Sequence, residues 1–441
     1  MPISPSRTAA FDILLAVENE SKDSSSLLAE RADELDEKDR GLCHEIVLGT
    51  LRRQMFLDAV LNSHSKKPLS KLDTEVLVSL RMGLYQLRYL DRIPDHAAVS
   101  DSVSLAVRAG KRSAKGFVNG ILRSAIRSRT DLGFVDEIEE LAVRESHPRW
   151  LVERWIGRFG IANTRSLLAF NNRAPSSEFR FTRKFDQLDG KEQERISRVI
   201  SALAVRSDLA DGSFRAVSAD NYLRKAFQSG LIYYQDQGSK VVADSIDTQP
   251  ADKVLDLCAA PGSKTTQIAR KVDPLAGSVT ACDVSERRIQ VLEENCLRQG
   301  AEFVSFVRLN AESRLPFANS SFDKVLVDAP CTGTGTIAQN PEIRYRVRPE
   351  DLPLMAAKQL SILENASKTV KPGGTLIYST CSLEGEENDS VAEEFLGNND
   401  EYEVEGLRLP QVLSNGKSGV SLTPQEHSTS GFFIAGFRRL R

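Results

Sequence analysis

The sequence predicts a chain of three parts: an all-α N-terminal segment, a small α+β middle segment, and a C-terminal α/β domain with a parallel sheet. Up to about residue 130, apolar residues recur at spacings of three and four, which is typical of helices. From about residue 250, short apolar runs alternate with helical patterns, which is typical of parallel strands joined by helices. Between them, both kinds of pattern occur.

The predicted boundaries follow these changes of pattern. We expect a helical domain over 1–130, an acidic linker over 131–145, a middle domain over 146–245 and the α/β domain over 246–441. Within the middle domain, a helix should start at Pro148 and end at Gly160, and a strand should follow over 177–182. Strands of the α/β domain are expected at 253–258, 278–283, 304–310, 323–328 and 375–379, and helices at 265–271, 286–299 and 352–370. The apolar run 431–437 should form a last edge strand.

Composition narrows the classes of protein. The 441 residues carry a net charge of -3, with 41% hydrophobic and 27% charged residues, an ordinary globular balance. Six cysteines without a CxxC pair, and only five histidines, argue against a zinc site and a disulfide framework. The sequence shows neither a signal-peptide pattern nor an apolar run of about 18 residues, so we expect a cytoplasmic protein without a membrane partner.

A basic window interrupts this acidic chain. Residues 102–130 contain no Asp or Glu. The basic residues there are Arg108, Lys111, Arg112, Lys115, Arg123, Arg127 and Arg129. They form either an ordinary solvated helix face or a patch that contacts phosphates, and the sequence leaves both open.

A loop of small residues joins the first strand of the α/β domain to a helix. It comprises Cys258, Ala259, Ala260, Pro261, Gly262, Ser263 and Lys264. Its glycine lets the backbone approach a ligand, and the helix start offers free N–H groups. The loop matches neither the phosphate-binding P-loop pattern nor the Gly-x-Gly-x-x-Gly of dinucleotide sites.

An acidic residue, Asp283, ends the next predicted strand about 20 residues further on, where such a residue accepts hydrogen bonds from ribose hydroxyls. The alternative is a surface acid without a ligand. The combination favours a cofactor that contains a nucleoside. Because the loop lacks the glycines of a diphosphate site, S-adenosylmethionine is favoured over NAD.

Two cysteines follow the ends of predicted strands. Cys331 lies in Asp328-Ala-Pro-Cys-Thr-Gly, and Cys381 lies in Tyr378-Ser-Thr-Cys-Ser. In a parallel sheet the carboxyl ends of strands are where ligands bind, so both thiols are candidates for covalent chemistry. The sequence gives Cys43, Cys282 and Cys296 no such motif, and we expect them to be small buried side chains.

These motifs, with Asn340-Pro-Glu-Ile-Arg between the two cysteines, resemble those of the RNA cytosine-C5 methyltransferases. The N-terminal segment resembles NusB, a helical RNA-binding domain. The whole is similar to the bacterial Sun/Fmu-type enzymes, which methylate a cytosine in 16S ribosomal RNA. The resemblance covers nearly the whole chain, and it implies a Rossmann-like S-adenosylmethionine methyltransferase domain behind a NusB-like domain.

The resemblance also assigns roles. It implies that loop 258–264 and Asp283 bind the cofactor, that Asp328 faces both cofactor and base, that Cys381 is the nucleophile and that Cys331 assists release. The third strand of the family often ends in Asp beside the adenine. This chain has Asn310 there, and whether Asn310 or Glu312 contacts the adenine stays open.

The implied partner is RNA, either 16S rRNA or a precursor of the small ribosomal subunit. The sequence does not set the oligomeric state, for which a monomer is the default expectation. Candidate RNA contacts near the site are Arg344, Arg346 and Arg348; weaker ones in the middle segment are Arg149, Arg180 and Arg183. Methylation of tRNA or 23S rRNA, DNA cytosine methylation and a non-catalytic NusB-like RNA-binding factor are the alternatives.

Overall fold

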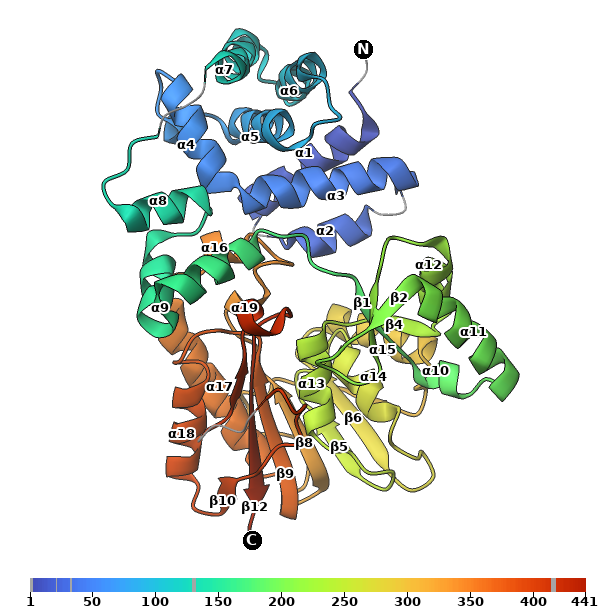
Figure 1. The fold of residues 1–441 in the computed structure, drawn as a ribbon. Coiled ribbons are helices and arrows are strands. Elements are labelled where there is room, and N and C mark those ends of the chain that lie inside the picture. Colours follow the sequence, from blue (N-terminus) through green and yellow to red (C-terminus); the bar gives the residue numbers. More distant parts are fainter. Residues whose placement is uncertain (1–2, 21, 32–33, 129–131, 414–417) are drawn as a thin grey trace. The chain divides into compact units, whose positions relative to one another are not determined.

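The computed structural model describes residues 3–20, 22–31, 34–128, 132–413 and 418–441. It divides into two compact units (Figure 1). The helical unit comprises Met1–Ala174 and Ile337–Val347, and the sheet unit comprises Pro175–Thr336 and Arg348–Arg441. This division differs from the expected one, because the segment before residue 175 packs with the helices. Of the expected linker, residue 131 lies outside the described part, while Glu137–Arg144 forms helix α8.

The helical unit is all-α over its described residues. Its helices include α1 Pro5–Glu20, α2 Ser24–Glu30, α3 Glu37–Arg52, α4 Gln54–His64, α5 Thr74–Tyr89, α6 Asp95–Arg108, α7 Lys115–Arg127, α8 Glu137–Arg144, α9 Arg149–Asn171 and the short α16 Ile343–Arg346. Two apolar clusters that share α5 form the core. Gly49 of α3 is required there, because a Cβ would lie 2.0 Å from the Tyr85 ring.

Helix α9 breaks where the sequence predicted a stop. Gly160 has φ +78° inside α9, a conformation that glycine adopts without steric cost, and a second helical stretch continues to Asn171. The expected helix from Pro148 to Gly160 is therefore present, with a continuation that the sequence did not indicate.

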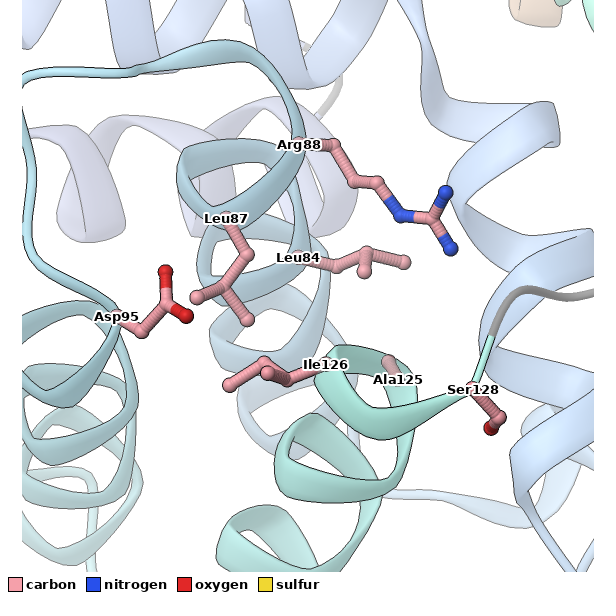
Figure 2. Close-up of a pocket in the computed structure, with 7 residues that line it drawn as sticks. All are labelled: Leu84, Leu87, Arg88, Asp95, Ala125, Ile126 and Ser128. Carbon is pink, nitrogen blue, oxygen red and sulfur yellow. The ribbon is translucent and has the colours of Figure 1, made fainter.

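A hollow of about 230 Å³ lies between α5, the start of α6 and the end of α7 (Figure 2). Arg88 and Asp95 are the charged residues of its lining, and the rest is Leu84, Leu87, Ala125, Ile126 and Ser128. None of the residues that the sequence singled out for chemistry lies there. No helix of the described residues is both long and apolar enough to cross a membrane.

The sheet unit begins with a small antiparallel sheet in the order β2-β3-β1-β4. Its strands are β1 Glu178–Phe181, β2 Ala204–Arg206, β3 Ser213–Ala216 and β4 Ile232–Tyr234, and its helices are α10 Arg183–Asp186, α11 Gly190–Leu203 and α12 Asn221–Gln228. An aromatic cluster that includes Phe179, Phe185 and Phe214 fills the space between this sheet and its helices. The expected α+β middle segment is thus present over residues 178–234.

The larger sheet has the order β10-β12-β9-β8-β5-β6-β7, with β11 paired to β12. Its strands are β5 Lys253–Asp256, β6 Ser278–Asp283, β7 Ser305–Arg308, β8 Phe322–Asp328, β9 Val370–Thr380, β10 Tyr402–Val404, β11 Val420–Leu422 and β12 Phe432–Arg439. Strands β5 to β9 are mutually parallel, and β10 and β12 run antiparallel to their neighbours. The five parallel strands are those expected from the sequence.

Helices cover both faces of this sheet. Helices α13 Gln237–Ser245, α14 Ser263–Ala269 and α15 Glu286–Arg298 contribute apolar side chains to one core cluster. Helices α17 Asp351–Ser367 and α18 Asp389–Asn398 contribute to the cluster on the other face. Successive residues of β5, such as Val254 and Leu255, belong to opposite clusters, as the alternation of side chains in a strand requires. This Rossmann-like arrangement is the one expected.

The prediction of an edge position for the last strand was wrong. Strand β12 pairs with β9 on one side and with β10 on the other. Its consecutive residues Phe432 to Phe437 are buried, which suits an interior strand with apolar clusters on both faces. The short strand β10 occupies the edge; its alternation spans too few residues to be recognised in the sequence.

Candidate active site

The sheet order places the candidate site. From β5 the chain adds β6 and β7 on one side, then returns to add β8 and β9 on the other. The loops that follow β5 and β8 therefore diverge, and ligands bind in the crevice at such a switch point. Loop 258–264 follows β5, and Asp328 ends β8, so topology alone brings these two predicted elements together.

Loop 258–264 is closely packed against α15. Gly262 has φ +103° and precedes the first residue of α14, and a Cβ on it would lie 2.7 Å from Leu292 Cδ1. Asp283 at the end of β6 is 3% exposed, and its Oδ2 lies 3.4 Å from both the Ala260 backbone nitrogen and an Arg288 guanidinium nitrogen. A backbone that tolerates no side chain, beside a strand-end carboxylate, fits the nucleoside part of S-adenosylmethionine.

A second buried carboxyl, Asp256, ends β5. Thr265 Oγ1 donates a 2.7 Å hydrogen bond to its Oδ2, while its buried Oδ1 has no protein partner among the described residues. Burial raises the pKa of Asp256 to about 7. Asp256 was not among the predicted site residues, although a carboxyl at the end of an apolar strand is a recognisable signal.

Asn310, the predicted adenine contact, is exposed after β7. Its Oδ1 accepts a 3.0 Å hydrogen bond from the Glu312 backbone N–H. Glu312 in turn forms a 2.9 Å ion pair with Lys358 of α17. Both side chains lie at the carboxyl end of β7, so the choice between them stays open.

Asp328 is held by two side chains. Lys264 Nζ lies 2.7 Å from Asp328 Oδ2, and Ser379 Oγ donates a 2.7 Å hydrogen bond to Oδ1. Lys264 is 7% exposed; burial acts to lower its pKa, but the Asp328 carboxylate outweighs this effect and the pKa is raised. A carboxyl group with a fixed orientation thus ends β8. Ser379, one residue before the end of β9, is a contact that the sequence analysis missed.

The two predicted thiols lie together. Cys331 Sγ and Cys381 Sγ are 3.2 Å apart, and both side chains are partly exposed. The hydrogen bond with Cys381, together with burial, raises the pKa of Cys331 well above its usual value. The arrangement places two thiols side by side, which suits covalent chemistry on one small group.

The other cysteines are unsuited to nucleophilic chemistry. Cys43, Cys282 and Cys296 are buried, and burial raises the pKa of each thiol. Burial also raises the pKa of Cys258 in the loop after β5. These four side chains stay protonated and contribute packing.

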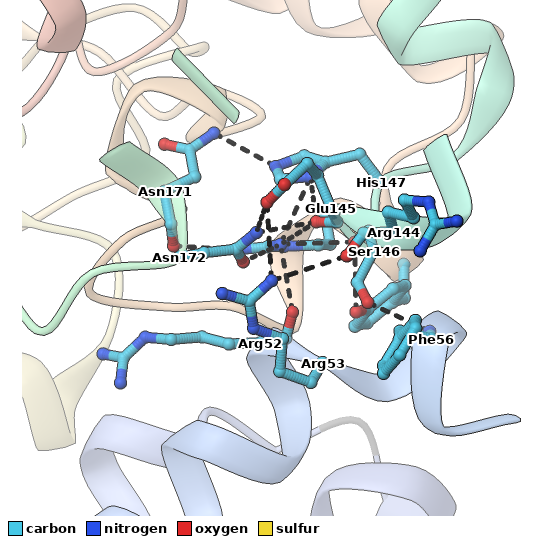
Figure 3. A network of polar contacts seen from close by, with 11 residues as sticks. Arg52, Arg53, Phe56, Arg144, Glu145, Ser146, His147, Asn171 and Asn172 are labelled. Carbon is cyan, nitrogen blue, oxygen red and sulfur yellow. Dashed lines mark hydrogen bonds and ion pairs between the residues drawn. The ribbon is translucent and has the colours of Figure 1, made fainter. Parts of the chain in front are cut away.

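The prediction that Arg344 binds RNA was wrong. Arg344 belongs to the helical unit and is 0% exposed. It donates to the Asn171 carbonyl oxygen at 3.1 Å, the Asn172 Oδ1 at 2.9 Å and the Ser146 carbonyl oxygen at 3.2 Å. Figure 3 shows these three acceptor residues close together. A cation in an Asn-Pro-Glu-Ile-Arg motif next to site residues suggested a ligand contact. Its actual role is to supply donors to backbone acceptors at the ends of helices.

The remaining predicted RNA contacts vary in accessibility. Arg180 is 1% exposed and is committed to Gln235 and Thr266, so its assignment was also wrong. Three others engage protein acceptors: Arg346 the Val17 and Lys22 carbonyl oxygens, Arg183 those of Ala269 and Val272, and Arg149 the carboxylates of Asp136 and Glu153. Arg348 is exposed and stays a candidate.

The basic window is divided in the same way. Arg108 pairs with Asp12, and Lys111 pairs with Asp73 and Glu75. Arg112, Lys115, Arg123 and Arg127 are exposed, while Arg129 lies outside the described residues. The exposed group keeps the phosphate-contact interpretation as a prediction.

The fold and the comparisons with known proteins define an S-adenosylmethionine-dependent methyltransferase joined to a NusB-type helical domain. Residues 243–438 match the family described as 16S rRNA methyltransferase RsmB/F, and residues 4–127 match the NusB family. The chain belongs to the RsmB/F family.

Full-length relatives support this membership. The chain is 32% identical to the probable ribosomal RNA small subunit methyltransferase B of Bacillus subtilis, over 98% of each chain. It is 32% identical to the ribosomal RNA small subunit methyltransferase B of Pseudomonas putida, over 97% of each. Among solved structures, PH0851 aligns over 100% of both chains with a TM-score of 0.84 and 26% identity. A methyltransferase homolog from Pyrococcus horikoshii covers 70% of this chain and 100% of its own, with a TM-score of 0.59 and 27% identity.

Proposed function

We propose that this enzyme methylates C5 of a cytosine in 16S ribosomal RNA through a covalent bond between Cys381 and C6 of the base. The observation that carries the proposal is that the Cys331 and Cys381 sulfur atoms lie 3.2 Å apart. Cys331 follows β8, which ends in Asp328, and Cys381 follows the neighbouring strand β9. The names of the relatives favour RNA of the small ribosomal subunit as the substrate.

The chemistry explains why two thiols are useful. C5 of cytosine is a weak nucleophile, and a thiolate that adds to C6 pushes electron density onto C5. S-adenosylmethionine supplies the electrophilic methyl group. A base then takes the C5 proton, which restores the C5–C6 double bond and expels the Cys381 sulfur as a thiolate. Thiolate suits both steps because it attacks well and also leaves well.

Each site residue has a place in this scheme. The resemblance gives Cys381 the attack on C6 and gives Cys331 a part in proton removal and elimination, either as the base or indirectly. Asp328, held by Lys264 and Ser379, would bind the base edge and stabilise charge that develops in the ring. Loop 258–264 and Asp283 would bind the cofactor. The base must leave its stack to reach these groups.

The test is transfer of a labelled methyl group from S-adenosylmethionine to bare 16S rRNA, assembled small subunits, 23S rRNA and transfer RNA, followed by bisulfite mapping. We expect one 5-methylcytosine in 16S rRNA. Label in transfer RNA or 23S rRNA alone would overturn the substrate but leave the chemistry intact. Label at another atom of the base would overturn the chemistry.

A further inference from the structure

One buried carboxylate, that of Glu387, lies between the segments that carry the two thiols. Thr332, the residue after Cys331, donates its backbone N–H to Glu387 Oε2 at 2.9 Å and its hydroxyl to Oε1. Ser382, the residue after Cys381, donates its hydroxyl to the same Oε1 at 2.6 Å. The carboxylate therefore binds the residue that directly follows each cysteine.

Two further side chains, Gln359 and Tyr378, also donate hydrogen bonds to Glu387. Glu387 is 0% exposed, and Gln359 Nε2 of α17 donates to its Oε2 at 2.9 Å. Tyr378 of β9 donates its hydroxyl to the Glu387 carbonyl oxygen at 2.5 Å. Four donors to one carboxylate replace the water that burial removes, which makes a costly buried charge tolerable. Such a network has one well-defined geometry.

We propose that Glu387 is a positioning residue that holds the two cysteine segments at the distance that lets both thiols act on one base. The proposal rests on the proposed function for the roles of the thiols. A carboxylate suits the task because both of its oxygens accept, so one side chain joins two segments that are 50 residues apart in the sequence. The hydrogen bonds of Glu387 hold Thr332 and Ser382. The charge of Glu387 also contributes to the raised pKa of Cys331.

A glutamine at this position would keep part of the arrangement. The N–H groups of Thr332 and Gln359 can only donate, so they require an acceptor at the Oε2 position. The hydroxyls of Thr332 and Ser382 can rotate and accept from an amide NH₂ instead. Glu387→Gln should therefore be a partial replacement, whereas Glu387→Ala removes every side-chain contact.

The closing experiment uses a readout that needs no RNA. The full-length protein is treated with diamide, and formation of the Cys331–Cys381 disulfide is followed by alkylation and mass spectrometry. The two thiols lose two electrons and two protons, which reduce the diazene to a hydrazine. Because misplacement by about 1 Å can cost about a hundredfold in rate, we expect Glu387→Ala to slow this reaction by about ten- to a hundredfold. Glu387→Gln should lie between Glu387→Ala and the unaltered protein.

Glu394→Gln on the exposed side of α18 is the matched control, because it removes an acidic charge in the same region without touching the cysteine segments. It should oxidise at the unaltered rate. If Glu387→Ala does not fold, the double variant Thr332→Val with Ser382→Ala deletes the two hydroxyl bonds and should show the same slowing.

Methyl transfer is measured in parallel. We expect a lower kcat for Glu387→Ala with an unchanged KM for S-adenosylmethionine, and partial rescue in Glu387→Gln. An unchanged rate of disulfide formation in Glu387→Ala would overturn the positioning role, whatever its activity. Slowed oxidation in a protein that methylates some atom other than cytosine C5 would overturn the proposed function and leave the positioning role standing.

Discussion

Two buried cations differ in the groups that they contact. Lys264 of the sheet unit contacts a carboxylate, whereas Arg344 of the helical unit contacts uncharged oxygens. Lys264 lies 2.7 Å from the Asp328 carboxylate, whose charge raises the Lys264 pKa despite burial. Arg344 donates mainly to backbone carbonyl and amide oxygens, and burial lowers its pKa to about 10. Both belong to sequence motifs beside the predicted site, yet the partner decides the role. A carboxylate partner forms an ion pair that orients Asp328, whereas carbonyl partners accept hydrogen bonds that fix neighbouring backbone segments.

The largest expected effect concerns the thiol beside the Lys264–Asp328 pair. Cys381→Ala removes the proposed nucleophile and should reduce methyl transfer to 16S rRNA by more than about 10⁴-fold. Thermal unfolding should change little, because the side chain is partly exposed. Release of tritium from 5-tritiated cytosine in RNA measures the effect, since it requires the C5 proton to leave. Unchanged tritium release would show that another group attacks C6.

Lys264→Met should have the next largest effect. It keeps the length of the side chain and removes the charge that orients Asp328, so the single-turnover rate should fall by about 10²–10³-fold, the range for loss of a preorganised electrostatic contact. Binding of 16S rRNA, measured by filter retention, should stay the same. If the loss were entirely in RNA affinity, Lys264 would be a phosphate contact instead.

Arg344→Met should act on stability. Several oxygens of the helical unit lose their donor, and an unsatisfied buried group costs about 1–3 kcal/mol, so we expect a loss of about 3 kcal/mol in the free energy of unfolding of this unit. Both tryptophans of the chain, Trp150 and Trp155, lie in α9, so fluorescence in urea reports on this unit selectively. Arg344→Lys should lose less, because it keeps one donor group.

Exposed Arg348 provides the control for this measurement. Arg348→Met should leave the fluorescence transition in place. A catalytic loss in Arg344→Met with an unchanged transition would return Arg344 to the list of RNA contacts and remove the contrast with Lys264.

The smallest expected effect is a pH dependence from Asp256. Its pKa is raised in the folded state to about 7, so the folded chain binds the proton more tightly than the unfolded chain and stability falls as pH rises. Between pH 5 and 7 the loss should be about 2 kcal/mol at 1.36 kcal/mol per pH unit. Asp256→Asn should abolish this slope in calorimetric unfolding of the sheet unit. A slope that persists in Asp256→Asn would place the titration elsewhere.

The sequence predicted those helices and strands that leave a clear spacing of apolar residues. The alternation of apolar runs and helical patterns indicated β5 to β9, and Gly160 correctly ended a helix. Topology then brought loop 258–264, Asp328 and the two thiols to one end of one sheet. The pairing of strands could not be predicted in the same way. The sequence indicated an edge position for β12, because its neighbour β10 is only three residues long and leaves no recognisable pattern.

Side-chain partners could not be predicted from the chain. Arg344 and Arg180 are charged residues near the recognised motifs. Only the structure shows that both are buried and that their guanidinium groups already donate to protein acceptors. Ser379 and Glu387 are ordinary polar residues in the sequence, and their contacts with Asp328 and Thr332 depend on loops that meet in three dimensions. Burial and hydrogen bonds are properties of the assembled sheet, so no local pattern encodes them.

The most direct test of the central claim is a covalent complex with RNA. Cys331→Ala, incubated with S-adenosylmethionine and 16S rRNA, should accumulate protein bound to the methylated cytosine through Cys381, because the step that releases it is impaired. Mass spectrometry of the digested complex identifies the cysteine that carries the nucleotide. Accumulation of a complex through Cys331 in Cys381→Ala, with none in Cys331→Ala, would contradict the assignment and exchange the roles of the two thiols.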